Sequence, residues 1–140
     1  MLLHSNAAAG ELRRALLYPL GSLAARLQGD DPWLAALLHE RLLAALDAGP
    51  AGAELVAALA GLGNAGWPAD AGRILAFVDD PDDAVRLAAV SALRGQQDPD
   101  SAGALAGALQ DPEPQIAALA RATLQERGLL AGDDGGPRPR

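Results

Sequence analysis

The densest group of chemically active side chains is an acidic cluster, Asp79, Asp80, Asp82 and Asp83, arranged around Pro81. Such a cluster could bind calcium, dock a basic partner or cap the helix that follows. Calcium loops place oxygen ligands around a turn, usually with a glycine and a bidentate glutamate. Here the proline stiffens the middle of the cluster, and aspartates before a helix satisfy its free N–H groups and its dipole. We therefore predict helix capping, with partner docking as the alternative.

The other residue types that carry catalysis or bind metals are few and scattered. His4 and His39 belong to no metal-binding motif, so we expect both at the surface. The chain has no cysteine, which excludes disulfides, thiolate zinc sites and cysteine nucleophiles. The serines have no nearby histidine, no lysine base and no nucleophile-elbow glycines. We expect neither an enzyme nor a cofactor.

Several single residues have both a structural and a functional interpretation. Arg86 follows Asp82 by four residues, so it can pair with it on one helix or reach a neighbouring turn. Trp33 and Trp67 would be binding hot spots if exposed, but we expect both to pack over the ends of helix pairs. Asn64 stands between a glycine and an alanine, and we predict that it takes a left-handed turn conformation.

The composition predicts an all-α protein that binds neither nucleic acid nor membranes. Of 140 residues, 33 are Ala and 26 Leu, whereas Phe and Tyr occur once each and Trp twice. Ala and Leu favour helices, while the residues that favour strands are scarce. The net charge of −7 repels phosphates and acidic lipids. The chain starts without a signal-peptide pattern and contains no long apolar run, so we expect a cytoplasmic protein.

A repeat of 31 residues organises the chain. The recurring positions are Pro50, Pro81 and Pro112, then Ala58, Ala89 and Ala120, then Leu62, Leu93 and Leu124. A period of this length with two helices per unit is typical of an α-solenoid. Upstream, the helical pattern of 11–27 is interrupted by Pro19 and Gly21, which indicates one kinked helix or two short ones. We divide the chain into a flexible start (1–9), a helical repeat domain (10–128) and a disordered tail (129–140).

The segment 79–94 resembles a HEAT repeat. It reads DDPDDAVRLAAVSALR, and in that family an aspartate-proline turn leads into a helix of the form VRxxAAxxAL. The copy at 111–127 is weaker because Ala117 stands where the family has its arginine. The resemblance implies a short α-α superhelix of about three helical pairs. It also implies that Arg86 reaches a neighbouring repeat's turn.

A second resemblance, to the helical superhelix of vitellogenin-type lipid-transfer proteins, covers about residues 15–127. Its motifs are LGSL at 20–23 and LGNAGWP at 62–68. That family holds lipid in large β-sheets, which this chain lacks, so the resemblance implies a related helical module at most. It would expose an apolar face at one end of the stack, where the last helix carries Ala117, Ala118 and Ala122.

These observations favour a non-catalytic module that binds another protein through its helical surface, with the lipid-transport module as the alternative. A bilin lyase, whose family also carries HEAT-like repeats, would need an acid–base or nucleophilic group that is not identifiable here. We further expect a weak homodimer through helices near one terminus. The residues predicted to contact a partner are Asp82, Asp83, Arg86, Ser91, Arg94 and Trp67.

Overall fold

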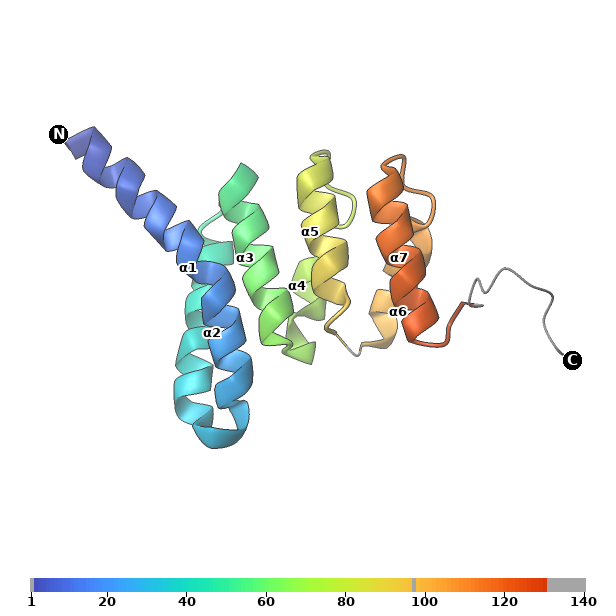
Figure 1. Ribbon diagram of the computed structural model, residues 1–140, viewed down its shortest axis with the longest axis horizontal. Coiled ribbons are helices and arrows are strands. Elements are labelled where there is room, and N and C mark those ends of the chain that lie inside the picture. The colour runs from blue at the N-terminus through green and yellow to red at the C-terminus, as the bar shows by residue number, and fades with distance from the viewer. Residues whose placement is uncertain (1, 97, 131–140) are drawn as a thin grey trace, which may run out of the picture.

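The computed structural model describes residues 2–96 and 98–130, and this part of the chain contains helices and no strand (Figure 1). The elements are α1 (Leu2–Asp30), α2 (Pro32–Asp47), α3 (Gly52–Ala65), the 3₁₀ helix η1 (Pro68–Asp70), α4 (Ala71–Leu75), α5 (Asp83–Leu93), α6 (Pro99–Ala108) and α7 (Pro114–Glu126). The all-α prediction is confirmed. None of the described helices is long and apolar enough to cross a membrane.

The helix boundaries follow local sequence signals. Asp31 caps α2, because its Oδ1 accepts a hydrogen bond of 3.1 Å from the Leu34 N–H, and Pro32 occupies the first helical position. At the other end of the next helix, Gly66 adopts a φ of 73°, the left-handed conformation that ends α3. Asn64 itself lies inside α3, so the predicted left-handed turn at this residue is wrong. Glycine takes that conformation two residues later because it has no Cβ to clash.

The 31-residue spacing recurs in the structure. The helices that follow Pro50, Pro81 and Pro112 begin at Gly52, Asp83 and Pro114, which are again 31 residues apart. The equivalent positions inside these helices are all buried; they are Ala58, Ala89, Ala120, Leu62, Leu93 and Leu124. The repeated alanines and leucines therefore mark the face that each helix turns to the core.

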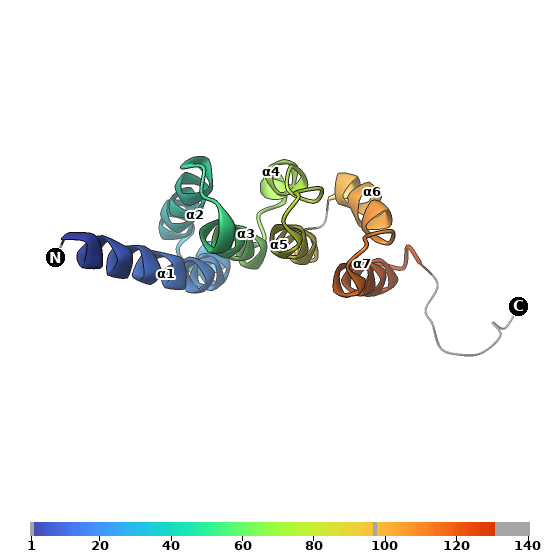
Figure 2. The ribbon, with the colours of Figure 1, turned by 90° about the horizontal axis from the view of Figure 1, so that it is seen from above.

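The helices lie in two rows, seen from above in Figure 2. One row contains α1, α3, α5 and α7, in which each helix contacts the next. The other row contains α2, α4 and α6, and these helices pack on α3, α5 and α7 respectively. The side chains of the core lie between the rows, with Leu42, Ile74 and Leu105 of the second row fully buried.

Helix α1 differs from what the sequence indicated. It runs without a break from Leu2 to Asp30 and contains Pro19 in its interior. Helix α1 therefore includes residues 2–9, the predicted start of the chain, together with the first part of the predicted repeat domain. Its N-terminal half projects away from the other helices (Figure 1). Of the predicted tail, Leu129 and Leu130 are described and 131–140 lie outside the described residues.

Glycines let the helices of the first row approach closely. Gly21 of α1 faces Gly61 of α3 so tightly that a Cβ at Gly21 would collide with the Gly61 carbonyl. A Cβ at Gly63 would lie 2.5 Å from the Ala92 Cα of α5. Gly21, which interrupts the helical pattern in the sequence, is thus a packing position within a continuous helix.

Candidate functional site

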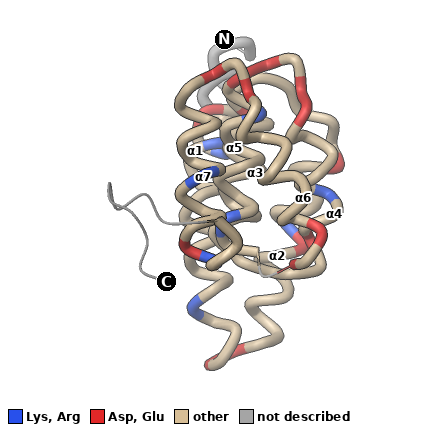
Figure 3. Tube along the Cα trace, turned by 90° about the vertical axis from the view of Figure 1, so that its right-hand side faces the viewer, with Lys and Arg blue, Asp and Glu red and all other residues tan. Residues whose placement is uncertain are grey.

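The acidic cluster caps α5. Asp82 is the N-cap residue, and its Oδ1 accepts a hydrogen bond of 2.9 Å from the Ala84 N–H. The Asp82 N–H in turn donates to Asp80 Oδ1 at 2.9 Å. The predicted capping role is confirmed for Asp82, while Asp83 is exposed in the first turn of α5. Figure 3 shows acidic residues at the upper turns. In the described part of the chain, no three His, Asp or Glu side chains lie so that they could together hold a metal ion.

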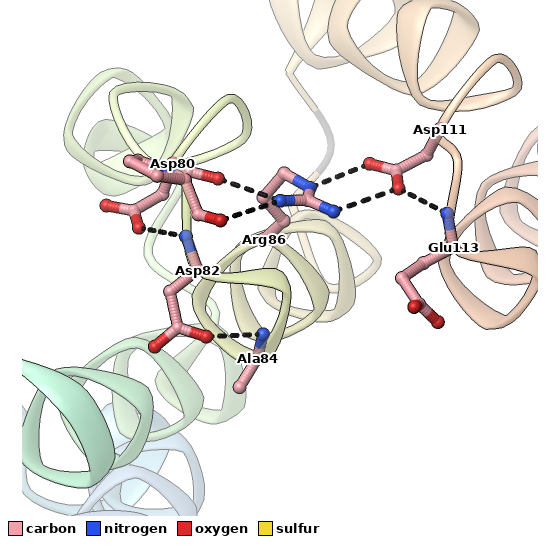
Figure 4. A network of polar contacts seen from close by, with 7 residues as sticks. Asp80, Asp82, Ala84, Arg86, Asp111 and Glu113 are labelled. Carbon is pink, nitrogen blue, oxygen red and sulfur yellow. Dashed lines mark hydrogen bonds and ion pairs between the residues drawn. The ribbon is translucent and has the colours of Figure 1, made fainter.

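Arg86 joins two successive turns (Figure 4). Its Nε and Nη2 donate to Asp111 Oδ2 and Oδ1 at 2.9 and 3.2 Å, and its Nη1 donates to the carbonyl oxygens of Asp80 and Pro81. The two charged side chains are only 15% and 7% exposed. The sequence left two alternatives for Arg86, a pair with Asp82 on the same helix or a contact with a neighbouring turn. The structure shows the contact with the neighbouring turn.

This ion pair changes the acidity of both groups. The hydrogen bonds from Arg86 lower the pKa of Asp111, although burial opposes this shift, and the Glu113 N–H lowers it further. The hydrogen bonds to Asp111 raise the pKa of Arg86, which stays charged throughout the accessible pH range. Because the Asp111 carboxylate is favoured in the folded state, its ionisation stabilises the fold above the ordinary Asp pKa of about 4.

We expect this stabilisation to disappear in acid. The stabilisation is complete above about pH 5, falls as the pH drops through 4, and is lost below the lowered pKa of the folded state. Asp111→Asn keeps the side-chain shape and removes the charge, so its urea midpoint should lie below that of the wild type at pH 7. The difference between the two midpoints should shrink steadily as the pH falls from about 5 toward the lowered pKa of Asp111.

Glu126→Gln is the matched control, because Glu126 forms a more exposed ion pair with Arg94. Its effect on the urea midpoint at pH 7 should be smaller and should vanish in high salt. A difference between wild type and Asp111→Asn that does not depend on pH would contradict the charge argument.

Two more arginines connect α5 to the last helical pair. Arg94 donates from Nε and Nη2 to the Glu126 carboxylate at 3.2 and 2.6 Å, and both side chains are half-exposed. Arg127 donates from Nη1 to Ser101 Oγ at 2.6 Å and from Nη2 to the carbonyl oxygens of Leu93 and Gln96. The sequence did not single out Arg127, although it ties the ends of α5, α6 and α7 together.

A groove of about 390 Å³ crosses the first row of helices. It is lined by Tyr18, Ala60, Gly63, Asn64, Ser91, Ala92, Arg94 and Gly95, which come from α1, α3 and the end of α5. The close packing of Gly63 against Ala92 and of Gly95 against the Gly63 carbonyl leaves a floor without large side chains. Tyr18, Ser91 and Arg94 are exposed, whereas Asn64 is half-buried.

Asn64 holds one side of this groove in place. Its Nδ2 donates to Ser22 Oγ and, at 3.3 Å, to the Tyr18 carbonyl oxygen, both in α1. Gln28 adds a third polar contact between the same helices, since its Nε2 donates to the Ala65 carbonyl at 3.1 Å. These contacts position the Tyr18 segment of α1 against α3.

The tryptophans and His39 lie elsewhere. Trp67 is half-buried and stacks on the His39 ring, with centroids 4.2 Å apart, and His39 Nε2 lies 2.7 Å from Asp70 Oδ2. The His39 side chain is only 12% exposed, so its predicted surface position is wrong. Trp33 is 73% exposed, so the predicted packing of this residue is wrong as well, while that of Trp67 is confirmed. The side chain of His4 lies outside the described residues.

The six residues predicted to contact a partner therefore occupy three places. Ser91 and Arg94 meet in the groove, whereas Asp82, Asp83 and Arg86 lie at the opposite end of α5. Trp67 covers the junction of α2 and η1. The structure adds Tyr18 and Asn64, which sequence reasoning missed as groove residues. The glycines inside the predicted helices were the sequence signal that could have indicated this groove, because a glycine there indicates close backbone approach.

Comparisons of this chain with protein-family models, with curated proteins and with solved structures found no significant match.

Proposed function

We propose that this chain is a non-catalytic, HEAT-type helical repeat module that binds another protein across α1, α3 and α5. The observation that carries the proposal is the groove with exposed Tyr18, Ser91 and Arg94 around a floor of glycine and alanine. Tyrosine and arginine are the residue types enriched among binding hot spots, and the small floor residues give a partner's side chains room to enter.

The electrostatics of the groove support this function. Arg94 is half-exposed and paired with a half-exposed Glu126, and such surface ion pairs contribute little to stability. A partner's carboxylate can therefore replace Glu126 at a small cost. We expect the partner to present an acidic group to Arg94 and an apolar side chain beside Tyr18.

The repeat interpretation supports a solenoid arrangement. The recurrence of 31 residues, the two rows of helices and the bond from Arg86 to the next turn agree with what the HEAT resemblance implies. Stacked repeats create an extended surface to which several units contribute. The groove involves three helices of one row, so its binding surface would span more than one repeat.

The test is partner capture by the full chain, followed by calorimetry with the purified partner. We expect Tyr18→Ala and Arg94→Ala each to raise the Kd at least about tenfold, because both side chains would lose buried contacts. Arg121→Ala is the control, since Arg121 is exposed on α7 and does not line the groove. A partner whose affinity is unchanged by both groove variants would contradict the proposal.

The lipid-transport module is a second candidate, supported by one observation. Large apolar side chains, among them Leu12, Leu16 and Leu37, are exposed on α1 and α2. For that function we expected an exposed apolar face at the other end of the fold, on the last helix. There Ala118 and Ala122 are exposed and Ala117 is half-buried. Lipid found by mass spectrometry in an organic extract of the purified chain would favour this candidate over the first.

A further inference from the structure

The N-terminal end of the fold has apolar surface that no described helix of the chain covers. Helix α1 has 29 residues and its antiparallel neighbour α2 has 16, so the N-terminal half of α1 extends past the other helices (Figure 1). An isolated helical segment of this length is only marginally stable in water. Leu12 and Leu16 lie one turn apart on this segment and are 62% and 49% exposed.

A groove lies beside this exposed stripe. It has a volume of about 630 Å³ and is lined mainly by apolar side chains, including Leu16 and Leu20 of α1 and Leu38 and Ala45 of α2. The groove lies between two long helices, so its shape suits a third helix with an apolar stripe. The projecting half of α1 is itself such a helix.

The distribution of charge favours a second copy of the chain as the occupant. Residues 1–48 contain five acidic and four basic residues, whereas 49–140 contain thirteen acidic and seven basic ones. Two copies therefore repel each other least at their N-terminal ends. The groove is flanked by Arg13 and Arg41, and the exposed Glu11 and Glu40 lie on the same two helices. In a symmetric dimer, the glutamates of one copy thus supply the opposite charge for the arginines of the other.

We propose that two copies of this chain associate through α1 and α2 around a twofold axis. The Leu12 and Leu16 stripe of each copy enters the groove between α1 and α2 of the other. In a twofold interface the same surface is used by both subunits, so one stripe and one groove per chain suffice. The contact covers the projecting half of α1 in both copies. The α1 and α2 helices of the two copies then form a four-helix arrangement.

The experiment is sedimentation equilibrium of the full chain at protein concentrations from about 5 to 500 µM. We expect a reversible dimer, and Leu12→Glu should raise its Kd at least about tenfold, because a charge would be buried in an apolar groove. Leu37→Glu on the adjoining face of α2 should act in the same direction. At the lowest protein concentration, where the wild type is itself mostly monomeric, helix content by circular dichroism should be the same in both variants as in the wild type, since both leucines are exposed in the single chain.

Leu129→Glu is the matched control, because Leu129 is 58% exposed after the last helix. It should dimerise like the wild type. A wild-type mass that stays monomeric at every concentration overturns the proposal. So does a dimer that Leu129→Glu dissociates while Leu12→Glu and Leu37→Glu leave it intact, or a native mass spectrum of the chain in which the monomer carries lipid and no dimer is present. Tyr18→Ala should not affect the dimer, which separates this test from that of the proposed function.

Discussion

Replacing Gly61 with alanine is expected to lower the free energy of unfolding by about 2–3 kcal/mol, although alanine is the better helix former. The new Cβ would lie 2.6 Å from the Leu17 carbonyl oxygen and 2.7 Å from Leu42 Cδ2. The first of these atoms belongs to the backbone of α1, so α1 and α3 would have to separate. That movement would also disturb the Asn64 contacts and with them the groove.

The measurement is urea unfolding of Gly61→Ala beside Gly103→Ala. Gly103 lies in α6, and a Cβ there would meet no heavy atom within 4 Å. Gly103→Ala should therefore leave the stability unchanged or raise it by up to about 1 kcal/mol, as helix propensity alone predicts. Equal effects of the two substitutions would show that the close approach of α1 to α3 does not decide the stability.

Arg127→Ala is expected to cost about 2–4 kcal/mol, because it removes a charged donor from three acceptors at once. The carbonyl oxygens of Leu93 and Gln96 and the Ser101 hydroxyl all accept from this side chain. The direct packing between α5 and α7 is less extensive than that between α3 and α5, so the last helical pair depends more on such polar ties. We expect the loss to appear as early unfolding of α6 and α7.

Hydrogen exchange and urea unfolding provide the test. Arg127→Lys should recover only part of the stability, because an ammonium group cannot reproduce the planar fork of the guanidinium. Arg121→Ala, at an exposed position of α7, should change the stability by less than about 0.5 kcal/mol. Exchange in α6 and α7 that is as slow in Arg127→Ala as in the wild type would contradict this role of Arg127.

Most helices could be predicted because their signals are local. Asp31 with Pro32 caps α2, and Asp82 caps α5. Between α3 and α5, the segment 68–79 is not one continuous helix but comprises η1, the short α4 and a turn. Pro19 was ambiguous, because a proline inside a helical pattern either ends the helix or is accommodated, and only packing against α3 decides between these outcomes.

The positions of single side chains were less predictable. His39 and Trp33 both lie on α2. Trp67 and Asp70, from the segment that follows α3, cover His39, whereas Trp33 stays 73% exposed. A helical pattern shows which face a residue occupies, but it does not show which distant segment packs on that face. The same reason explains why Tyr18 was missed as a residue that lines the same groove as Arg94.

The all-α class, the 31-residue recurrence of helix starts and the capping of α5 follow from local sequence. These depend on propensity, periodicity and contacts within a few residues of the chain. Long-range packing was needed to show that Arg86 bonds to Asp111, that Arg127 joins three helix ends and that Tyr18 and Arg94 line one groove. Those contacts join residues more than 20 positions apart, and the groove also depends on how closely Gly21, Gly61 and Gly63 allow α1, α3 and α5 to pack.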